Sequence, residues 1–483
     1  MTQAAAASRP NILWICTDQH RYDALGVTGN PYVRTPNIDR LAEQGVTFSR
    51  AYTQSPVCTP SRACFLTGRY PRTTRVRQNG NEYFPKDEVL VTKLLADQGY
   101  DCGLVGKLHL SAAEGQMENR PDDGYRVFRW SQHPHDDWPG ANDYQLWLKA
   151  QGIEWNEHYR LGDWKNLFPP GEGGIAAEYH QTTWCAEEAI SFIKEERNEP
   201  WLLSVNIFDP HPPYDPPLAY REKYPADRMP LPKYKEGELD SKPPIQQKDY
   251  LEGGQAGTGP CFARMSETEK RQAIADYYAM IELIDDQVGR MIAALEESGQ
   301  RERTIVIFMS DHGEMLGDHG LYWKGAYFYE ELVHVPLIMS WPGKFAHNLR
   351  SDALVELVDL APTLLEAAGI ETPYYMQGTS LLPILTGQAD PSQHKDHVYC
   401  EYYYALNGIH DTYATMYLDG KYKIVVYHGE AVGELYDLQA DPNEFCNLWD
   451  DPDHKELKLD LLQSNFDSSV MIIDPKPLMI KYY

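Results

Sequence analysis

The chain has 483 residues and a formal net charge of −27, because 71 acidic residues outweigh 44 basic ones. This length indicates one large domain with a smaller one, and the acidic balance argues against nucleic acid or an anionic membrane as the main partner. No apolar run approaches the length of a membrane span, and the N-terminus lacks a signal core. With eight scattered cysteines, this pattern predicts a cytoplasmic protein with reduced thiols.

Short apolar runs alternate with helical patterns up to about Ser392, which predicts an α/β fold with a large mixed, mostly parallel sheet flanked by helices. Strands are expected at Asn11–Cys16, Asp101–Val105, Trp201–Phe208, Thr304–Met309 and Val335–Ser340. Helices are expected at Thr35–Glu43, Lys86–Gln98, Trp184–Glu195, 266–299 and Leu354–Ala368. The fourth of these helices opens with a capping box formed by Ser266 and Glu269.

The texture changes after Ser392, where Tyr-rich alternation predicts a small antiparallel sheet followed by a helix. The expected elements are strands at His397–Tyr404, Thr412–Leu418 and Lys421–His428 and a helix near His454–Gln463. We therefore divide the chain into a main domain, residues 1–390, and a smaller α+β subdomain, residues 391–483. The apolar and aromatic tail Met471–Tyr483 is suited to docking on its own domain or on a second subunit, which leaves a homo-oligomer open.

Two long segments, Ala112–Gly174 and Asp209–Gly259, are rich in Pro, Asp, Trp and Tyr. Both are too long for simple connections between elements, so they are expected to form substrate-binding loops.

Polar residues follow four of the predicted strands directly, namely Asp18 and Gln19, then Lys107 and His109, then Asp209 and His211, and finally Asp311 and His312. One such cluster is usually only a turn. Since parallel sheets bind ligands at the carboxyl ends of their strands, four clusters bearing Asp, His or Lys predict a shared site.

Asp18 and Asp311 are the best candidates for metal ligands, although either alone is also explained as a helix cap. With the amide of Gln19 and the imidazole of His312 they would form an oxygen-rich site with one nitrogen. Calcium accepts such oxygen donors, while the nitrogen also admits manganese or zinc. A divalent cation there would polarise a bound oxyanion and offset the acidity of the chain locally.

The stretch Cys58–Arg69, with the sequence CTPSRACFLTGR, places a cysteine just before an expected helix start. Thr59 is expected as the N-cap, and Gly68 as the C-terminal stop. Cys58 would then lie near the positive end of the helix dipole, with Arg62 one turn away. A lone cysteine in such a place is usually buried and structural.

The same stretch resembles the signature of the type I sulfatases, C-x-P-S-R-x-x-x-[LF]-T-G, at every defined position. The resemblance extends from Asn11 to about Leu448, with matching blocks at Thr35–Leu41, Gly106–His109, Ser310–Gly313 and Glu434–Leu438. The chain is thus similar to the formylglycine-dependent sulfatases, which have the alkaline-phosphatase-like fold. In that family a formylglycine-generating enzyme oxidises the cysteine to formylglycine, whose hydrate is the nucleophile.

The resemblance implies a role for each polar candidate. It implies a divalent cation, most often calcium, held by Asp18, Gln19, residue 58, Asp311 and His312. It implies that the hydrate is steadied by Arg62 and Lys107, and that sulfate is held and the leaving oxygen assisted by Lys324 and His211. In the mechanism that we expect, His109 deprotonates the second hydroxyl of the hydrate. Asn79 and His133 are expected to contact the substrate.

Two positions depart from the family pattern, because many members carry a second Asp at the place of Gln19 and an Asn at that of His312. A Gln at the first position is similar to the phosphonate monoester hydrolases, whereas the Lys107–His109 block is of the sulfatase type. The sequence therefore predicts an enzyme that hydrolyses a sulfate monoester, either an aryl sulfate or a sulfated carbohydrate, as a small molecule or an oligosaccharide. A phosphonate monoester or phosphodiester hydrolase is the alternative, and a non-catalytic binder of sulfated glycans is a further one.

Overall fold

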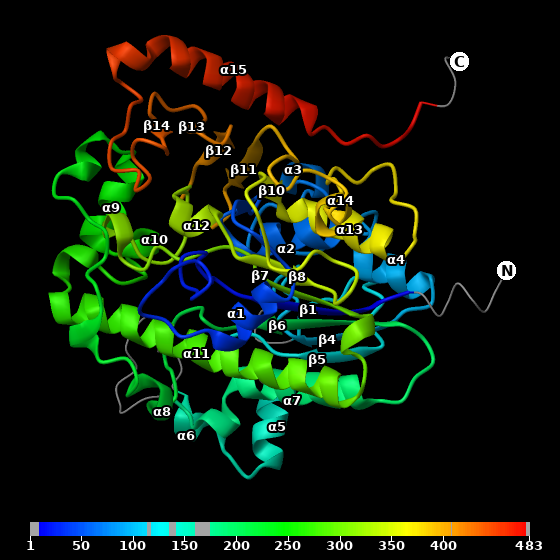
Figure 1. Ribbon diagram of the computed structural model, residues 1–483. Coiled ribbons are helices and arrows are strands. Elements are labelled where there is room, and N and C mark those ends of the chain that lie inside the picture. The colour runs from blue at the N-terminus through cyan, green and yellow to red at the C-terminus, as the bar shows by residue number, and fades with distance from the viewer. Residues whose placement is uncertain (1–8, 114–116, 135–141, 160–173, 407, 480–483) are drawn as a thin grey trace.

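The computed structural model describes residues 9–113, 117–134, 142–159, 174–406 and 408–479 (Figure 1). Its centre is an eight-stranded sheet in the order β5-β4-β6-β1-β7-β8-β2-β9. The strands are β1 (Asn11–Thr17), β2 (Val46–Phe48), β4 (Asp101–Gly106), β5 (Val127–Trp130), β6 (Trp201–Ile207), β7 (Thr304–Ser310), β8 (Leu337–Ser340) and β9 (Leu349–Ser351). All neighbours pair in parallel except β7 with β8 and β8 with β2, which confirms the predicted mixed, mostly parallel sheet.

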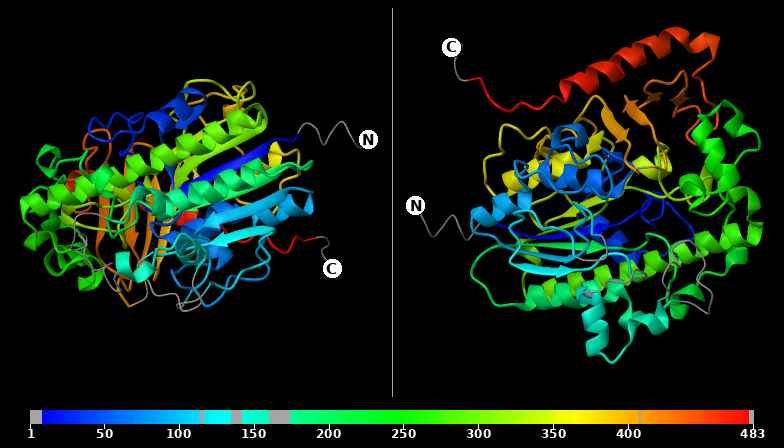
Figure 2. Two further views of the ribbon diagram at one scale, coloured as in Figure 1. Left: turned by 90° about the horizontal axis from the view of Figure 1, so that it is seen from below. Right: turned by 180° about the vertical axis from the view of Figure 1, so that it is seen from behind.

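Helices cover both faces of this sheet (Figures 1 and 2). One face packs against α1 (Pro36–Glu43), α7 (Gln181–Lys194) and α11 (Glu267–Glu297). The other packs against α2 (Cys58–Thr67), α4 (Val91–Asp97) and α13 (Leu360–Ala367). Alternate residues of β1 enter the two cores, since Ile12 and Trp14 face one and Leu13 and Ile15 the other. A strand buried on both faces therefore reads as one continuous apolar run.

Three predicted helices can be compared closely with the structure. The helix expected from Lys86 begins only at Val91, as α4. The one expected from Leu354 begins with a short strand, and its helical part has Pro362 in the first turn, where the missing N–H breaks no helical bond. The long helix α11 has both capping-box bonds, from Ser266 and from Glu269, as predicted.

The two long segments expected as loops contain regular structure of their own. The first holds β5, α5 (Asp143–Ala150) and α6 (Trp155–His158), while its residues 114–116, 135–141 and 160–173 lie outside the described part. The second holds α8 (Leu218–Arg221), α9 (Pro244–Glu252) and α10 (Gly254–Gly257). The remaining short elements are α3 (Pro71–Thr74), α12 (Glu330–Val333), α14 (Leu382–Leu385) and the paired strands β3 (Ala51–Tyr52) and β10 (Val355–Glu356).

The predicted C-terminal antiparallel sheet is confirmed and has four strands rather than three. They are β11 (Val398–Tyr403), β12 (Tyr413–Leu418), β13 (Tyr422–Tyr427) and β14 (Gly433–Asp437), each paired with the next. The final helix α15 (Lys455–Met471) lies across this sheet and runs beyond the predicted end at Gln463 (Figure 1).

The tail after α15 docks on the main domain of its own chain. The carbonyl of Ile472 accepts hydrogen bonds from Thr73 Oγ1 and Gln377 Nε2, both at 2.8 Å. Asp474 lies 2.9 Å from Nη2 of the buried Arg69, the last residue of the Cys58–Arg69 stretch. The tail thereby braces the region just after α2, and a homo-oligomer stays a prediction.

No helix among the described residues combines the length and apolarity needed to cross a bilayer. All eight cysteines lie within the described part of the chain, and each is free of a disulfide.

Removing residues 472–483 should lower the free energy of unfolding by about 1–3 kcal/mol, because the buried Arg69 and Thr73 and the half-buried Gln377 lose polar partners. Denaturant unfolding would measure this loss. Removing only residues 477–483 is the matched control and should change stability little, so equal stability of the two truncated proteins would contradict the bracing role.

Candidate active site

The four predicted polar clusters meet at one edge of the sheet. Strands β4, β6, β1 and β7 are neighbours and run parallel, so their carboxyl ends lie side by side. Asp18 follows β1, Lys107 follows β4, and Asp311 follows β7, while His211 lies four residues beyond β6. The sheet topology therefore brings together side chains that are far apart in the sequence.

Helix α2 begins at Cys58 itself, with Val57 in extended conformation as its N-cap, so the prediction of Thr59 as N-cap is wrong. Val57 has no side-chain acceptor, and the N–H of Thr59 instead donates to Asn79 Oδ1 at 3.0 Å. Gly68 ends the helix in the left-handed conformation, as predicted, with a φ of 68°. Asn79 thus acts as a surrogate cap for the helix that carries the cysteine.

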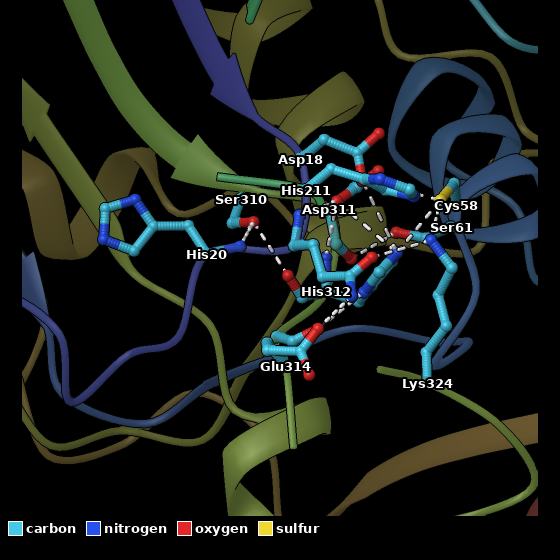
Figure 3. A network of polar contacts seen from close by, with 12 residues as sticks. Asp18, His20, Cys58, Ser61, His211, Ser310, Asp311, His312, Glu314 and Lys324 are labelled. Atoms are coloured by element: carbon cyan, nitrogen blue, oxygen red, sulfur yellow. Dashed lines mark hydrogen bonds and ion pairs between the residues drawn. The ribbon is translucent and has the colours of Figure 1, made fainter. Parts of the chain in front are cut away.

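Cys58 contacts three charged or titratable groups (Figure 3). Its Sγ lies 2.9 Å from Lys324 Nζ, 3.0 Å from His312 Nε2 and 3.5 Å from Asp18 Oδ1. Burial and Asp18 alone would raise the pKa of the thiol, but nearby cations, Lys107 and Lys324 foremost, bring this pKa below its ordinary value. At Cys16 burial outweighs the nearby cations, and the pKa of that thiol is raised.

Two buried carboxylates beneath Cys58 are paired with cations from two other elements. Arg62 Nε lies 2.9 Å from Asp311 Oδ2, and Arg62 Nη2 lies 3.3 Å from Asp18 Oδ2. Lys107 Nζ contacts the same Asp18 oxygen at 2.5 Å. Burial alone would raise the pKa of Asp18, yet Lys107, with further positive charge around it, holds this pKa well below its ordinary value.

Four of the five predicted metal-binding residues, all except Gln19, have ligand atoms close enough to share one ion. Ligand atoms of Asp18, Cys58, Asp311 and His312 all lie within 4.8 Å of one another. His312 Nδ1 donates to the Gly313 carbonyl at 2.8 Å, which leaves Nε2 as the ligating nitrogen. Two carboxylates, one imidazole and the group at position 58 fit a divalent cation.

A cavity of about 260 Å³ opens above Cys58. Its lining includes the predicted residues Gln19, Cys58, Asn79, Lys107, His109, His133, His211 and Lys324. Arg62, Asp18, Asp311 and His312 are fully buried beneath it. The other lining residues, none of them predicted individually, are Gln132, Phe208, Pro212, Gln255, Trp323 and Leu406. Gln132, Pro212 and Gln255 belong to the two long segments predicted to form substrate-binding loops, whereas Leu406 comes from a distant segment and carried no signal.

The surroundings of the two histidines predicted to move protons disfavour the charged form of each ring. Burial, followed by the charge of a neighbouring lysine, lowers the pKa of both His109 and His211 well below its usual range. His211 Nδ1 donates to the Pro212 carbonyl at 2.7 Å, which leaves Nε2 as an acceptor. The ring of His133 lies beside that of His211, with 6.0 Å between their centroids.

The sequence profile of the sulfatase family matches residues 10–370. The chain belongs to the sulfatase family. A second profile, described as the C-terminal part of N-sulphoglucosamine sulphohydrolase, matches residues 317–468. Together the two profiles span nearly all of the described chain.

Relatives of this sulfatase align with it over almost their whole length. The multifunctional alkaline phosphatase superfamily protein PehA of Trinickia caryophylli is 32% identical, over 94% of each chain. An arylsulfatase of Clostridium perfringens is 29% identical over 94% of this chain and 93% of its own. The fold is shared with the phosphonate monoester hydrolase SpPMH of Silicibacter pomeroyi, with a TM-score of 0.84 at 24% identity over 98% of each chain.

Replacing Asn79 with Ala should lower the free energy of unfolding of this sulfatase by about 1 kcal/mol, because the first turn of α2 loses its acceptor. Thermal or denaturant unfolding measures the change. Asn79→Asp keeps an acceptor oxygen and should stay near the wild-type value. Equal losses in the two variants would show that the cap to Thr59 does not stabilise the helix.

Proposed function

We propose that this sulfatase hydrolyses a sulfate monoester, an aryl sulfate or a sulfated carbohydrate, through a formylglycine made from Cys58. The observation that carries the proposal is the position of Cys58 Sγ at the floor of the cavity, 2.9 Å from Lys324 Nζ and 3.0 Å from His312 Nε2. A structural cysteine has no need of such neighbours. This pairing supports a reacting group at residue 58.

The proposal includes two groups that complete the site. Formylglycine, formed from Cys58 by a formylglycine-generating enzyme, supplies as its hydrate a nucleophilic hydroxyl and a second hydroxyl through which sulfate is expelled. A divalent cation would be held by Asp18, Gln19, Asp311 and His312 with residue 58, and supplies a positive charge that favours the oxyanion. Calcium suits the oxygen donors best, with manganese and zinc as alternatives because of His312.

The remaining residues position the substrate and move protons. Lys107 and Lys324 line the cavity and offer ammonium groups to the sulfate oxygens. Arg62 fixes Asp18 and Asp311 from below. Burial and the charge of Lys107 lower the pKa of His109, which favours the neutral ring that would accept a proton from the second hydroxyl. Asn79 and His133 line the cavity and are proposed to contact the alcohol part of the substrate.

His211 is the proposed donor of the proton to the leaving alcohol. In the structure its pKa lies well below the usual range, first because of burial and then because of Lys324. A bound sulfate monoester would add negative charge beside His211 and Lys324. This charge raises the pKa of His211 and favours its protonated form. The substrate thereby supplies the protonation state that its own cleavage needs.

A phosphonate monoester or phosphodiester hydrolase is the second candidate function. Gln19 favours it, since an amide rather than a second carboxylate joins the proposed ligand set, while Lys107 and His109 favour the sulfatase. Values of kcat/KM for an aryl sulfate and an aryl phosphonate monoester, measured on the same protein, would rank the two. A higher value for the phosphonate would overturn the order proposed here.

We also propose that the protein works in a reducing compartment, the cytoplasm. Support comes from the cysteines, all eight of which are unpaired, with Cys16, Cys64, Cys102, Cys185 and Cys400 buried among other side chains. In that compartment the substrate would be a small sulfate ester rather than a polymer.

Replacing Cys58 with Ala should abolish sulfatase activity, with a loss in kcat of at least about 10³-fold, because no nucleophile remains. Turnover of 4-nitrophenyl sulfate gives the rate. The intact mass of the peptide carrying residue 58 gives the fraction converted to aldehyde, with which activity should scale. Full activity in the Ala variant would contradict the proposed mechanism. A wild-type protein that binds sulfated glycans without turning them over would instead favour the non-catalytic binder.

Replacing His211 with Ala should lower kcat by about 10²–10⁴-fold for a sulfated sugar, because an alkoxide leaves only when it is protonated. The loss should be much smaller for 4-nitrophenyl sulfate, whose phenolate leaves without a proton. Parallel kcat measurements on both substrates test this difference. Equal losses would assign His211 to sulfate binding instead.

A further inference from the structure

Glu314 is a fully buried carboxylate with no role in the proposed mechanism. It comes two residues after His312 and is set apart from the group around Cys58 (Figure 3). Its Oε1 accepts hydrogen bonds from the backbone N–H of Leu316 at 2.9 Å and of Trp323 at 2.5 Å. Its Oε2 accepts from Gln19 Nε2. Each of these partners is a donor, which matches the acceptor-only character of a carboxylate.

This contact fixes which end of the Gln19 amide faces the site. In the structure Glu314 accepts from Nε2 of Gln19, so that Oε1 of the amide points the other way. There Oε1 accepts from Lys324 Nζ at 2.8 Å, and the same ammonium lies 2.9 Å from Cys58 Sγ. A flipped amide would set NH₂ against ammonium on one side and oxygen against carboxylate on the other.

The backbone of Gln19 is held as firmly as its side chain. Its φ of 68° is in the left-handed region, which is unfavourable for a residue other than glycine. The N–H of Gln19 donates to Asp311 Oδ1 at 3.1 Å, and its carbonyl accepts from Tyr277 OH at 2.8 Å. With both backbone groups paired, the amide orientation depends on what meets its two ends.

We infer that Glu314 is a positioning residue, which holds the Gln19 amide so that an oxygen rather than an NH₂ group faces Lys324 and the cation-binding residues. The inference rests on the proposed function in so far as Gln19 serves as an oxygen ligand. It also accounts for the amide at this position. The negative charge that a second Asp at position 19 would bring is carried instead by Glu314, which contacts the far end of the Gln19 amide. The amide therefore presents an uncharged oxygen to the site.

The isosteric change Glu314→Gln separates orientation from packing. The oxygen of the introduced amide would keep the two backbone N–H bonds, so its NH₂ group would face residue 19. Gln19 must then turn its own oxygen toward that new NH₂ group and its own NH₂ toward Lys324. We expect calcium affinity of the metal-stripped, matured protein to fall by about 10-fold or more, the scale seen for residues that orient metal ligands. Calorimetric titration with Ca²⁺ gives the affinity, and kcat for an aryl sulfate should fall with it.

The reciprocal exchange tests the contact itself. Gln19→Glu alone sets two buried carboxylates against each other, and we expect its melting temperature without calcium to fall by several degrees. In the double variant Gln19→Glu with Glu314→Gln, the new amide donates to the new carboxylate, whose other oxygen accepts from Lys324. We expect this protein to regain the lost melting temperature and to bind calcium at least as tightly as the wild type.

Glu401→Gln is the matched control, because Glu401 is also a buried carboxylate that accepts a backbone N–H, that of Arg72 at 2.7 Å. It belongs to β11 of the C-terminal sheet and pairs with the Arg72 side chain rather than with Gln19, so its replacement should leave calcium affinity unchanged. Wild-type calcium affinity in Glu314→Gln, or a double variant no more stable than Gln19→Glu, would overturn the inference. A wild-type protein that binds no divalent cation would contradict the proposed function alone, since the melting temperatures without calcium still test the contact.

Discussion

The burial of charge at the carboxyl ends of four strands is the constraint on which the rest of the site depends. Asp18 and Asp311 have no exposure to water, and carboxylates are stable in such places only when they are paired. The parallel sheet delivers the two acids, while the cations come from the elements packed around it: Arg62 from α2 and Lys107 from the end of β4. The sheet topology that brings the two carboxylates together therefore also requires buried cations beside them.

Helix α2 supplies one of these cations, Arg62, and also carries Cys58, the proposed reacting residue. Cys58 and Arg62 are four residues apart and so lie on one face of the helix, which points at the strand ends. Because Arg62 anchors this face to both carboxylates, the position of residue 58 is set by an ion-pair network. Asn79 holds the start of the helix, and the C-terminal tail braces Arg69 just beyond its end. Segments distant in sequence thus fix one short helix.

The sequence was sufficient for features that follow from local pattern or from strand order. The apolar runs predicted the central strands, and the polar residues after them predicted where Asp18, Lys107 and Asp311 would meet. Contacts that depend on three-dimensional packing could not be read in this way. Thr59 is a residue type favoured at N-caps, but the acceptor for the first turn of α2 is Asn79 Oδ1, twenty residues away. Nothing in the sequence pointed to Glu314, because its partner Gln19 follows another strand 295 residues earlier in the chain.

The cavity also limits how this sulfatase can distinguish one anion from another. None of the described residues that line it is acidic, so the net charge of −27 acts on a substrate mainly outside, where salt screens it within about 8 Å. Sulfate monoesters and phosphonate monoesters each carry a single negative charge at neutral pH, so the lysines attract both. Discrimination between the two esters must then come from the side chains that contact the non-bridging substituents of sulfur or phosphorus. Lys107 and His109 line the cavity just beyond the end of β4, so this strand end supplies a lysine and a histidine that can contact those substituents.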